Sequence, residues 1–297
     1  MRIRANQMGT SNEPKRAVYA ALISPAGLGA ILDDVVVFDC RFSLADAEEG
    51  RRLYDASHIP GAVYAHLDED LSGFVVAGQT GRHPLPDADA FASFLARSGV
   101  SRDTQVVCYD DRGGAIAARL WWMMKWIGHD AAAVLDGGWP AWEGAGYPTT
   151  PLASLKAQGN IVASAIPGLV VDSSEMADIV QRNDHVIIDA RAHERYAGTV
   201  EPIDPVAGHI PGARSLPFAD NLEQQTFLRP DALAKRFRAV VGNAESSETI
   251  VYCGSGVTAA HNALAMVIAG LGMPRLYAGS WSEWITDPAR GVALDDA

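Results

Sequence analysis

Short apolar runs alternate along the chain with longer stretches in which apolar residues recur at helical spacing. The apolar runs cover residues 35–38, 106–109, 186–188 and 250–252. The helical patterns cover residues 24–32, 116–127, 173–180 and 259–271, and we expect Ser24 to cap the first and Ser173 or Ser174 the third. Short runs rich in β-branched residues are typical of strands buried on both faces. The alternation favours an α/β fold, in which helices flank a mainly parallel sheet.

The same succession of elements and motifs occurs twice. Four pairs of segments share their order and character: residues 35–41 with 186–191, 58–62 with 209–213, 105–109 with 249–253, and 135–142 with 277–284. The clearest pair is HIPGA, at His58–Ala62 and at His209–Ala213. The third pair matches Tyr109 with Cys253. Markers that recur in one order over so long a distance predict two copies of a globular domain rather than a solenoid.

The domain boundaries follow from this repeat. We predict a tail at residues 1–17, an N-terminal domain at 18–147, a linker at 148–165 and a C-terminal domain at 166–297. A chain of 297 residues is long enough for two domains, and the proposed linker is polar and rich in proline. The N-terminal segment lacks the apolar block of a secretory signal, and no uncharged apolar run reaches 18 residues. We therefore expect a cytoplasmic protein without a membrane span.

Charge and cysteine content narrow the possible chemistry. The net charge of −12 opposes binding to nucleic acid and to anionic membranes, so a few local arginines must hold any anionic substrate. The three cysteines, Cys40, Cys108 and Cys253, form no CxxC pair. This pattern argues against a disulfide scaffold and against a cysteine-based zinc site. A single reactive thiol remains possible.

Cys253 is the candidate nucleophile, because it lies between a predicted buried strand and a helix that begins near Thr258. Ligands bind at the carboxyl ends of the strands in open α/β sheets. Gly254 and Gly256 would allow the positive φ angles of a loop whose backbone N–H groups point inward. Those donors and the helix N-terminus would favour a thiolate. The alternative is an inert buried cysteine, with the glycines serving a tight turn.

One position argues against a cysteine phosphatase, which has a loop of similar shape. Such an enzyme needs an arginine six residues after the cysteine to bind phosphate with two hydrogen bonds. Here that position is Ala259, and no lysine or arginine occurs between Cys253 and Arg275. A phosphate dianion would therefore be poorly compensated.

Together these features resemble the two-domain rhodanese-type sulfurtransferases. The resemblance covers nearly the whole chain after the tail and rests on both HIPGA segments, both Gly-Trp segments and the loop CGSGVTA at 253–259. The loop is similar to that of members that prefer 3-mercaptopyruvate, whereas members that prefer thiosulfate carry CRKGVT. The resemblance implies that Cys253 takes the sulfur of 3-mercaptopyruvate as a persulfide, releases pyruvate, and passes the sulfur to cyanide or to a thiol such as that of a thioredoxin-like protein. It implies no metal or organic cofactor.

Two other functions remain open at this point. One is a thiosulfate:cyanide sulfurtransferase that uses the same site. The other is a rhodanese module that carries or senses sulfur without catalysis. The intact cysteine in a complete loop argues against the second alternative.

The resemblance also implies which arginine binds the substrate. It places the carboxylate-binding residue at Arg195. Arg191 is expected to be structural, because Arg41 occupies the same place in the first copy. Some relatives carry a second arginine after a Glu-Pro segment, but the corresponding residues 201–204 contain none.

A catalytic triad is implied as well. Ser255 would act as a proton relay, or else as a turn residue. The resemblance pairs it with a histidine of the first domain, for which His58 is the candidate, and with Asp46 or Glu49 as the acid. The alternative for His58 is a loop-anchoring role, since His209 repeats it in the other copy.

The remaining residues of note receive more ordinary roles. Thr258 would donate to the persulfide or cap the helix, and the candidate anion-binding loop comprises Gly254, Ser255, Gly256, Val257 and Thr258. Tyr109 and the acids after it should make the first copy catalytically silent, with Cys40 and Cys108 in the core. His83 and His129 are expected to be surface or hydrogen-bonded loop residues rather than metal ligands. The tryptophans expected in the core or between domains are Trp139, Trp142, Trp281 and Trp284.

Overall fold

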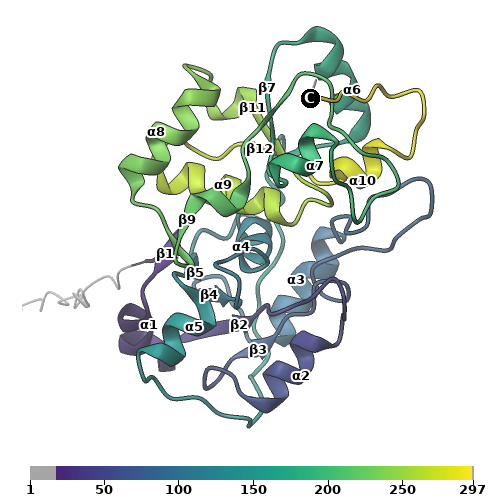
Figure 1. Ribbon diagram of the computed structural model, residues 1–297. Helices are drawn as coiled ribbons and strands as arrows, with labels where there is room; N and C mark the ends of the chain where they lie inside the picture. The colour runs from purple at the N-terminus through teal and green to yellow at the C-terminus, as the bar shows by residue number, and fades with distance from the viewer. Residues whose placement is uncertain (1–17, 296–297) are drawn as a thin grey trace, which may run out of the picture.

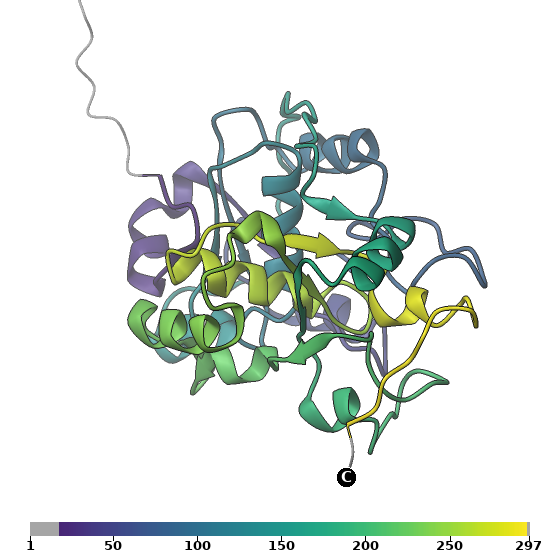
Figure 2. The same cartoon turned by 90° about the horizontal axis from the view of Figure 1, so that it is seen from above.

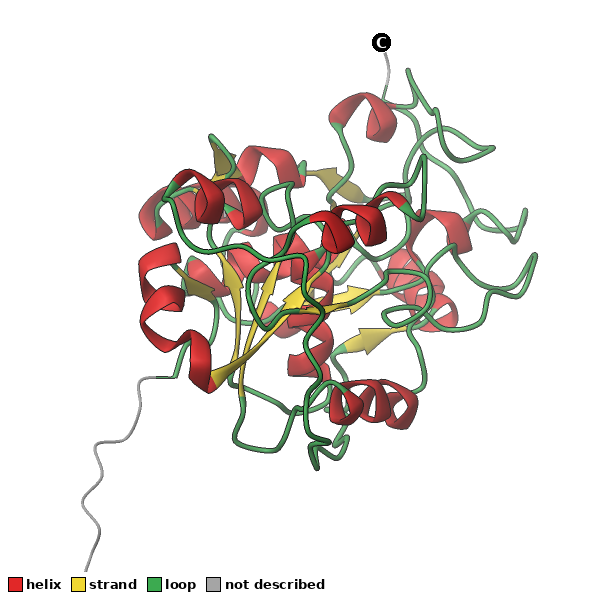
Figure 3. Ribbon diagram, turned by 90° about the horizontal axis from the view of Figure 1, so that it is seen from below, coloured by secondary structure: helices red, strands yellow, loops and turns green. Residues whose placement is uncertain are grey.

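The computed structural model describes residues 18–295, so the predicted tail at 1–17 lies outside the described residues. The chain forms two lobes, which Figure 1 shows one above the other. Each lobe contains one parallel sheet of five strands, and Figure 3 shows these strands in the interior with helices around them. The arrangement confirms the predicted α/β fold of two tandem domains.

The first sheet has the strand order β1-β5-β4-β2-β3, with every neighbouring pair parallel. Its strands are β1 (Leu22–Ile23), β2 (Val35–Asp39), β3 (Val63–Tyr64), β4 (Gln105–Tyr109) and β5 (Ala132–Leu135). The helices of this domain are α1 (Pro25–Ile31), α2 (Glu49–Ala56), α3 (Ala88–Arg97), α4 (Ala117–Trp126) and α5 (Gly138–Gly144). Because side chains alternate along a strand, Val36 and Phe38 join the core under α3 and α4, whereas Val35 and Val37 face α1, α2 and α5.

The second sheet repeats this plan in the order β6-β12-β11-β7-β8. Its strands are β6 (Val170–Val171), β7 (Val186–Asp189), β8 (Ala213–Ser215), β11 (Thr249–Tyr252) and β12 (Arg275–Tyr277). Its helices are α6 (Ser173–Arg182), α7 (His193–Ala197), α8 (Pro230–Val241), α9 (Thr258–Ile268) and α10 (Ser280–Trp284). An antiparallel hairpin, β9 (Leu222–Glu223) and β10 (Thr226–Phe227), is inserted before α8, and α8 and α9 lie side by side (Figure 2).

The helix caps confirm one expectation and correct another. The Ser24 hydroxyl accepts a hydrogen bond from the Gly27 N–H at the start of α1, as predicted. At α6 the cap is Asp172, whose carboxylate accepts from the Glu175 N–H, so the predicted cap at Ser173 or Ser174 is wrong. A carboxylate caps a helix as well as a hydroxyl does and also favours the positive end of the helix dipole.

The strand register corrects the internal alignment by one residue. β4 pairs with β2 so that Tyr109 lies opposite Asp39, and β11 pairs with β7 so that Tyr252 lies opposite Asp189. Tyr109 is therefore the counterpart of Tyr252, and its predicted match with Cys253 is wrong. Both segments are apolar and end in a polar position, so their pattern alone does not fix the register to a single residue.

The two domains share one hydrophobic core. Helices α4 and α9 pack against each other between the sheets (Figure 1), and their buried side chains belong to one cluster that extends from β2 to β11. The hairpin β9–β10 reaches the first domain, where the Phe227 N–H donates to the Asp136 carboxylate at 2.9 Å. The interface is thus a continuous packed layer. No helix within residues 18–295 is both long and apolar enough to cross a membrane.

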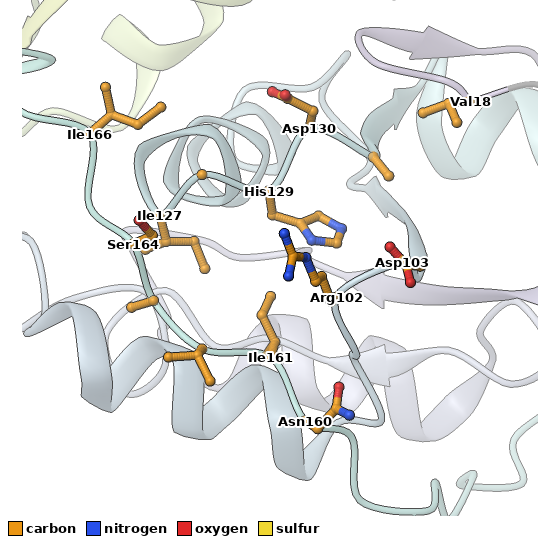
Figure 4. A pocket seen from close by; sticks show the side chains of 14 residues that line it. Val18, Arg102, Asp103, Ile127, His129, Asp130, Asn160, Ile161, Ser164 and Ile166 are labelled. Carbon is orange, nitrogen blue, oxygen red and sulfur yellow. The ribbon is translucent and has the colours of Figure 1, made fainter.

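The linker runs along the first domain without forming a helix or a strand of its own. Backbone hydrogen bonds join Gly159 to Ala96 and Ser164 to Ile127, and Ile161 is buried. Linker and domain enclose a surface hollow of about 920 Å³, where Figure 4 shows Arg102 beside His129. Neither the candidate nucleophile nor its arginine lines this hollow.

Candidate active site

Cys253 lies directly after β11, at the carboxyl end of the central strand of its sheet. Its side chain is 2% exposed, and its Sγ accepts a hydrogen bond from the Gly256 N–H at 3.1 Å. Gly256 has a φ of +77°, and a Cβ there would lie 2.3 Å from the Ala278 carbonyl oxygen. Only glycine meets both conditions, so the loop that presents an N–H group to the thiol depends on this residue.

Gly254 does not have the predicted role, but its missing side chain matters in another way. The predicted positive φ occurs at Gly256 and not at Gly254. A Cβ at Gly254 would instead lie 2.9 Å from Nη2 of Arg82 and 3.5 Å from Nη1 of Arg195. The missing side chain therefore leaves room for two guanidinium groups next to Cys253.

The remaining loop residues line one pocket with Cys253. This pocket, of about 310 Å³, lies between the domains and includes Ser255, Val257 and Thr258. Helix α9 has no side-chain cap, so the structure does not show the capping interaction considered for Thr258. The candidate thiol therefore lies in a pocket that residues of both domains line.

Asp110 is the counterpart of Cys253 in the first domain. The Trp139 N–H donates to the Asp110 carbonyl oxygen, as the Trp281 N–H does to that of Cys253. The buried Asp110 carboxylate accepts four backbone hydrogen bonds of 2.8–2.9 Å, from Arg112, Gly114, Ile116 and Ala117. The first domain thus has the same inward-pointing amides, but its own carboxylate already occupies them.

Two acids hold Arg195 and Arg82 in the pocket. Arg195 donates to Glu201 and Asp204 through Nε and Nη2, and Arg82, which comes from the first domain, donates to Asp204 through Nη1. Burial acts to raise the pKa of Glu201, but hydrogen bonds from Arg195 and backbone amides outweigh it and keep that pKa below its usual value. Glu201 is therefore ionised at neutral pH and fixes the orientation of Arg195.

The free ends of these two arginines converge beside the nucleophile. The hydrogen bonds to the acids leave Nη1 of Arg195 and Nη2 of Arg82 next to Gly254. Two guanidinium ends close together can bind a carboxylate with several charge-assisted hydrogen bonds. The sequence prediction missed Arg82, because residues 201–204 were the only place considered for a second arginine. The basic pair Arg82-His83, enclosed by Gly81 and Pro84, is the signal that could have indicated it.

Arg191 is held away from such a role by its own contacts. Its guanidinium donates to Asp189 and to the Gly208 carbonyl oxygen, and it stacks on the Trp281 ring at 4.7 Å. Arg41 makes the same ion pair with Asp39 in the first domain. The repetition supports the structural role expected for Arg191.

His83, and not His58, is the partner of Ser255. Nδ1 of His83 lies 2.7 Å from the Ser255 Oγ, and Nε2 lies 3.1 Å from a carboxylate oxygen of Asp68. Burial, with a smaller contribution from Arg119 and Arg82, lowers the pKa of His83 to about 3. The ring is therefore neutral at pH 7. With Asp68 ionised, Nε2–H donates to the carboxylate and Nδ1 accepts from the Ser255 hydroxyl.

His58 has a structural environment instead. Its Nδ1 lies 2.7 Å from the Tyr54 carbonyl oxygen, and its ring stacks on Tyr54 at 3.9 Å. His209 contacts Tyr196 in the same way in the second domain. The predicted pairing of His58 with Ser255 is therefore wrong, because a histidine that recurs in both copies serves what both copies share.

The two candidate acids do not join the site either. The exposed Asp46 pairs with Arg52, and Glu49 begins α2. Within residues 18–295 neither contacts His83 or Ser255, and the carboxylate beside His83 is that of Asp68. The prediction failed here because it looked for an acid close to His58, which is not the histidine that contacts Ser255.

The expected core residues lie where the sequence placed them. Cys40 and Cys108 are fully buried, and burial raises the pKa of Cys108 above its usual value. His129 is buried, with Nε2 at 2.8 Å from the Thr104 carbonyl oxygen. Among the tryptophans, Trp142, Trp281 and Trp284 are buried, and Trp139 stacks on Arg41.

One group of side chains has the spacing of a metal site, namely Glu48, His66 and Glu69. Nδ1 of His66 accepts from backbone N–H groups of residues 68 and 69, and Nε2 contacts the Ala47 carbonyl oxygen. Both ring nitrogens are therefore in use, and Arg51 pairs with both glutamates. The contacts favour a role in holding the loop that carries Asp68 rather than metal binding.

The comparisons with known proteins agree with this architecture. The model of the rhodanese-like domain matches residues 24–145 and again residues 172–287. A probable 3-mercaptopyruvate sulfurtransferase of Pseudomonas aeruginosa is 47% identical over 93% of this chain and 99% of its own. A putative thiosulfate sulfurtransferase of Mycobacterium tuberculosis is 37% identical over 93% of this chain and 98% of its own.

The solved structures give the same result. The 3-mercaptopyruvate sulfurtransferase from Leishmania major matches with a TM-score of 0.78 and 31% identity, over 93% of this chain and 75% of that one. Two family matches that span most of each domain, and relatives of this similarity over most of the chain, leave one conclusion. The chain belongs to the rhodanese family and consists of two rhodanese-like domains in tandem.

Proposed function

We propose that this protein is a sulfurtransferase that takes the thiol sulfur of 3-mercaptopyruvate onto Cys253 as a persulfide and releases pyruvate. The relatives that match over most of the chain are named as sulfurtransferases, which are transferases. The observation that carries the choice of donor is the convergence of two arginine ends beside Gly254, while the loop itself contributes no cation. Such a pocket suits a substrate whose carboxylate lies apart from the sulfur that is transferred.

Arg195 and Arg82 would bind the substrate carboxylate from opposite domains. Their free Nη groups lie next to Gly254, so the carboxylate would be held beside the loop and the substrate sulfur would face Cys253. Fixing the substrate at one end orients the reacting atoms, which is a large part of what an enzyme can contribute to a displacement. Asp204, which contacts both arginines, would keep the two guanidinium groups together when the pocket is empty.

The sulfur transfer balances within the pocket. The Cys253 thiolate attacks the substrate sulfur, a new S–S bond forms, and the C–S bond breaks with its electron pair moving into the enolate of pyruvate. The proton of the substrate thiol passes through the Ser255 hydroxyl, with His83 as the neutral acceptor behind it, and returns to the methylene carbon of the enolate. The products are pyruvate and a Cys253 persulfide anion. The Gly256 N–H, which already points at Sγ, would stabilise this anion.

The second half of the cycle needs a sulfur acceptor. Cyanide, or a thiol such as that of a thioredoxin-like protein, would attack the outer sulfur and return Cys253 to the thiolate. The pocket reaches the surface past the exposed side chains of Leu44 and Ile203. An apolar rim of this kind suits an acceptor that arrives as part of a protein.

A comparison of the two sulfur donors tests the proposal. We expect kcat/KM for 3-mercaptopyruvate, followed as pyruvate release with cyanide as acceptor, to exceed kcat/KM for thiosulfate with the same acceptor. A preference for thiosulfate would favour the rhodanese alternative on the same site. No turnover with either donor, in a folded protein, would favour the carrier or sensor alternative.

A further inference from the structure

Arg119, in α4 of the first domain, is a fully buried cation whose contacts are all neutral. Its Nη1 donates to the Gly256 carbonyl oxygen at 3.0 Å, and its Nη2 donates to the His83 carbonyl oxygen at 3.0 Å and to that of Leu71 at 3.2 Å. A weaker contact reaches the carbonyl oxygen of Pro84. Its Nε has no acceptor, and none of the carboxylates within residues 18–295 forms an ion pair with it.

A charge in this position is costly, so a purely structural explanation is insufficient. Burial of an unpaired ion strongly opposes folding, whereas a neutral side chain could pack in the same space. Burial lowers the pKa of Arg119 to about 10, although the nearby Cys253 acts to raise it. The guanidinium is therefore still protonated at neutral pH. Cys253 is the ionisable side chain that interacts with it electrostatically.

Arg119 contacts the catalytic loop from behind. Gly256 receives the Arg119 hydrogen bond on its carbonyl oxygen and donates its own N–H to the Cys253 sulfur. A second hydrogen bond of Arg119 fixes the backbone of His83, whose ring contacts Ser255. One guanidinium thus connects both halves of the site, the thiol and the proton relay, without touching the sulfur.

The second domain contacts the loop of the first domain in a similar way, but through a neutral side chain. His261, in α9, lies with Nε2 at 3.1 Å from the Gly113 carbonyl oxygen in the loop of the first domain. Burial lowers the pKa of His261 to about 4, so its ring is neutral at pH 7. That loop contains the permanent carboxylate of Asp110, which its own amides already stabilise. Each domain therefore supports the loop of the other, but only the loop that holds the thiol receives a cation.

We propose that Arg119 is a positioning residue that supplies the counter-charge for the anion on Cys253, acting through the Gly256 peptide group. The cation stabilises the thiolate before sulfur transfer and the persulfide anion after it. The buried charge is thus compensated by an anion that the reaction maintains at Cys253. The proposal rests on Cys253 being the reactive thiol of the proposed function, but it does not depend on which sulfur donor is used.

Alkylation of the full-length protein tests this role without any sulfur donor. The rate of Cys253 alkylation by iodoacetamide is measured against pH, with the modified peptide identified by mass spectrometry. Arg119→Met, which is neutral and of similar length, should shift the midpoint of the thiol titration upward by about one pH unit, a tenfold loss of thiolate. Arg119→Lys, which keeps the charge, should stay close to the wild-type midpoint. His261→Gln, the matched change at the reciprocal contact, should leave the midpoint unchanged.

Several outcomes would overturn the proposal. A folded Arg119→Met protein with the wild-type midpoint would show that the charge does not act on the thiol. Equal shifts in the Met and Lys variants would show that packing, and not charge, is what matters. If Arg119→Met and Arg119→Gln both fail to fold while Arg119→Lys folds, the charge serves folding as a whole. If the midpoints shift as expected but neither donor is turned over, the proposed function fails and the role of Arg119 stands.

Discussion

The loops after β4 and β11 are built alike but surround different side chains. In the first domain the loop amides surround the carboxylate of Asp110, which is part of the chain and is fully satisfied by four N–H groups. In the second domain the corresponding position is Cys253, whose Sγ accepts a single hydrogen bond within residues 18–295, from the Gly256 N–H. The comparison indicates that the same loop geometry can enclose a carboxylate of the chain itself, or present a thiol to a pocket between the domains.

The first domain is nevertheless part of the proposed active site. Asp68 and His83 complete the relay to Ser255, and Arg82 points its free end at the Cys253 loop. The second domain alone therefore contains the candidate nucleophile without all the groups that would bind the substrate and move its proton. The thiol thus belongs to one copy of the fold, whereas many of the side chains around it belong to the other copy.

The largest expected effect comes from the thiol itself. Cys253→Ser should abolish sulfur transfer, with a loss of at least about a thousandfold, because a hydroxyl neither ionises at neutral pH nor forms a persulfide. Cys40→Ser and Cys108→Ala, which alter buried cysteines elsewhere, should keep substantial turnover. Steady-state rates of pyruvate release decide the matter. Wild-type turnover in the Cys253 variant would contradict the proposal that the second loop, unlike the first, carries the nucleophile.

The proton relay should have the next largest effect. His83→Gln should lower kcat by roughly 10²–10⁴, the usual range for general acid–base groups, with a smaller change in KM. His58→Gln is the matched control, because it removes a buried histidine of the same domain that does not contact the pocket. Its thermal midpoint should fall while its kcat stays near that of the wild type. The reverse result for the two variants would restore His58 as the relay residue.

Removal of the arginines that are proposed to bind the substrate carboxylate is expected to change mainly KM. Arg195→Ala should raise the KM for 3-mercaptopyruvate about tenfold to a hundredfold, as expected for the loss of hydrogen bonds to a charged group. Arg82→Ala should have an effect of the same kind, and Arg195→Lys should recover only part of the loss. Steady-state kinetics with both variants measures this. An unaltered KM in Arg195→Ala would rule out that residue as the anchor.

Asp110 should matter for stability and not for catalysis. Asp110→Ala leaves four buried N–H groups without their acceptor and should lower the free energy of unfolding by at least about 3 kcal/mol. Asp111→Ala, at the neighbouring and more exposed acid, should cost much less. Urea unfolding gives the stabilities, and kcat per folded molecule should stay near the wild-type value. A small stability change in Asp110→Ala would mean that the permanent anion is not what holds the first loop together.

The smallest effect is a dependence of stability on pH. His83 and His261 have pKa values lowered to about 3 and about 4, so between these values and about pH 6.5 the unfolded chain binds protons that the folded chain does not. The free energy of unfolding should therefore fall as the pH drops from 6.5 to 5, by up to about 1.4 kcal/mol per pH unit for each histidine. His261→Gln should make this decline shallower. An identical slope in wild type and variant would contradict the assigned neutral state of His261.

The sequence allowed the fold and the position of the candidate nucleophile in a strand-to-helix loop to be predicted, because both depend on local patterns. Buried strands, the repeated HIPGA segment and the loop at Cys253 are contiguous in the chain. The partner of Ser255 was not predicted, because His83 lies 172 residues away and only the packing of the two domains brings them together. Features common to both copies report the shared fold. The repeat therefore helped to predict the fold, but for the same reason the repeated His58 was a misleading candidate for the active site.

The match between Tyr109 and Cys253 failed for a physical reason as well. Two apolar strands can be aligned with a slip of one residue at little cost in pattern similarity, and only the pairing of Tyr109 with Asp39 and of Tyr252 with Asp189 fixes the register. The roles proposed for Arg82 and Arg119 rest on contacts across the domain interface. Contacts of this kind leave no periodic signal in the sequence.

The most direct test of the central claim, that the thiol of the second loop receives the sulfur, is mass spectrometry of the whole protein after incubation with 3-mercaptopyruvate and without an acceptor. We expect a gain of one sulfur atom, located by peptide analysis at Cys253 and absent from Cys40 and Cys108, and its removal by cyanide. A protein that gains no sulfur under these conditions, or that carries it on another cysteine, would contradict the claim.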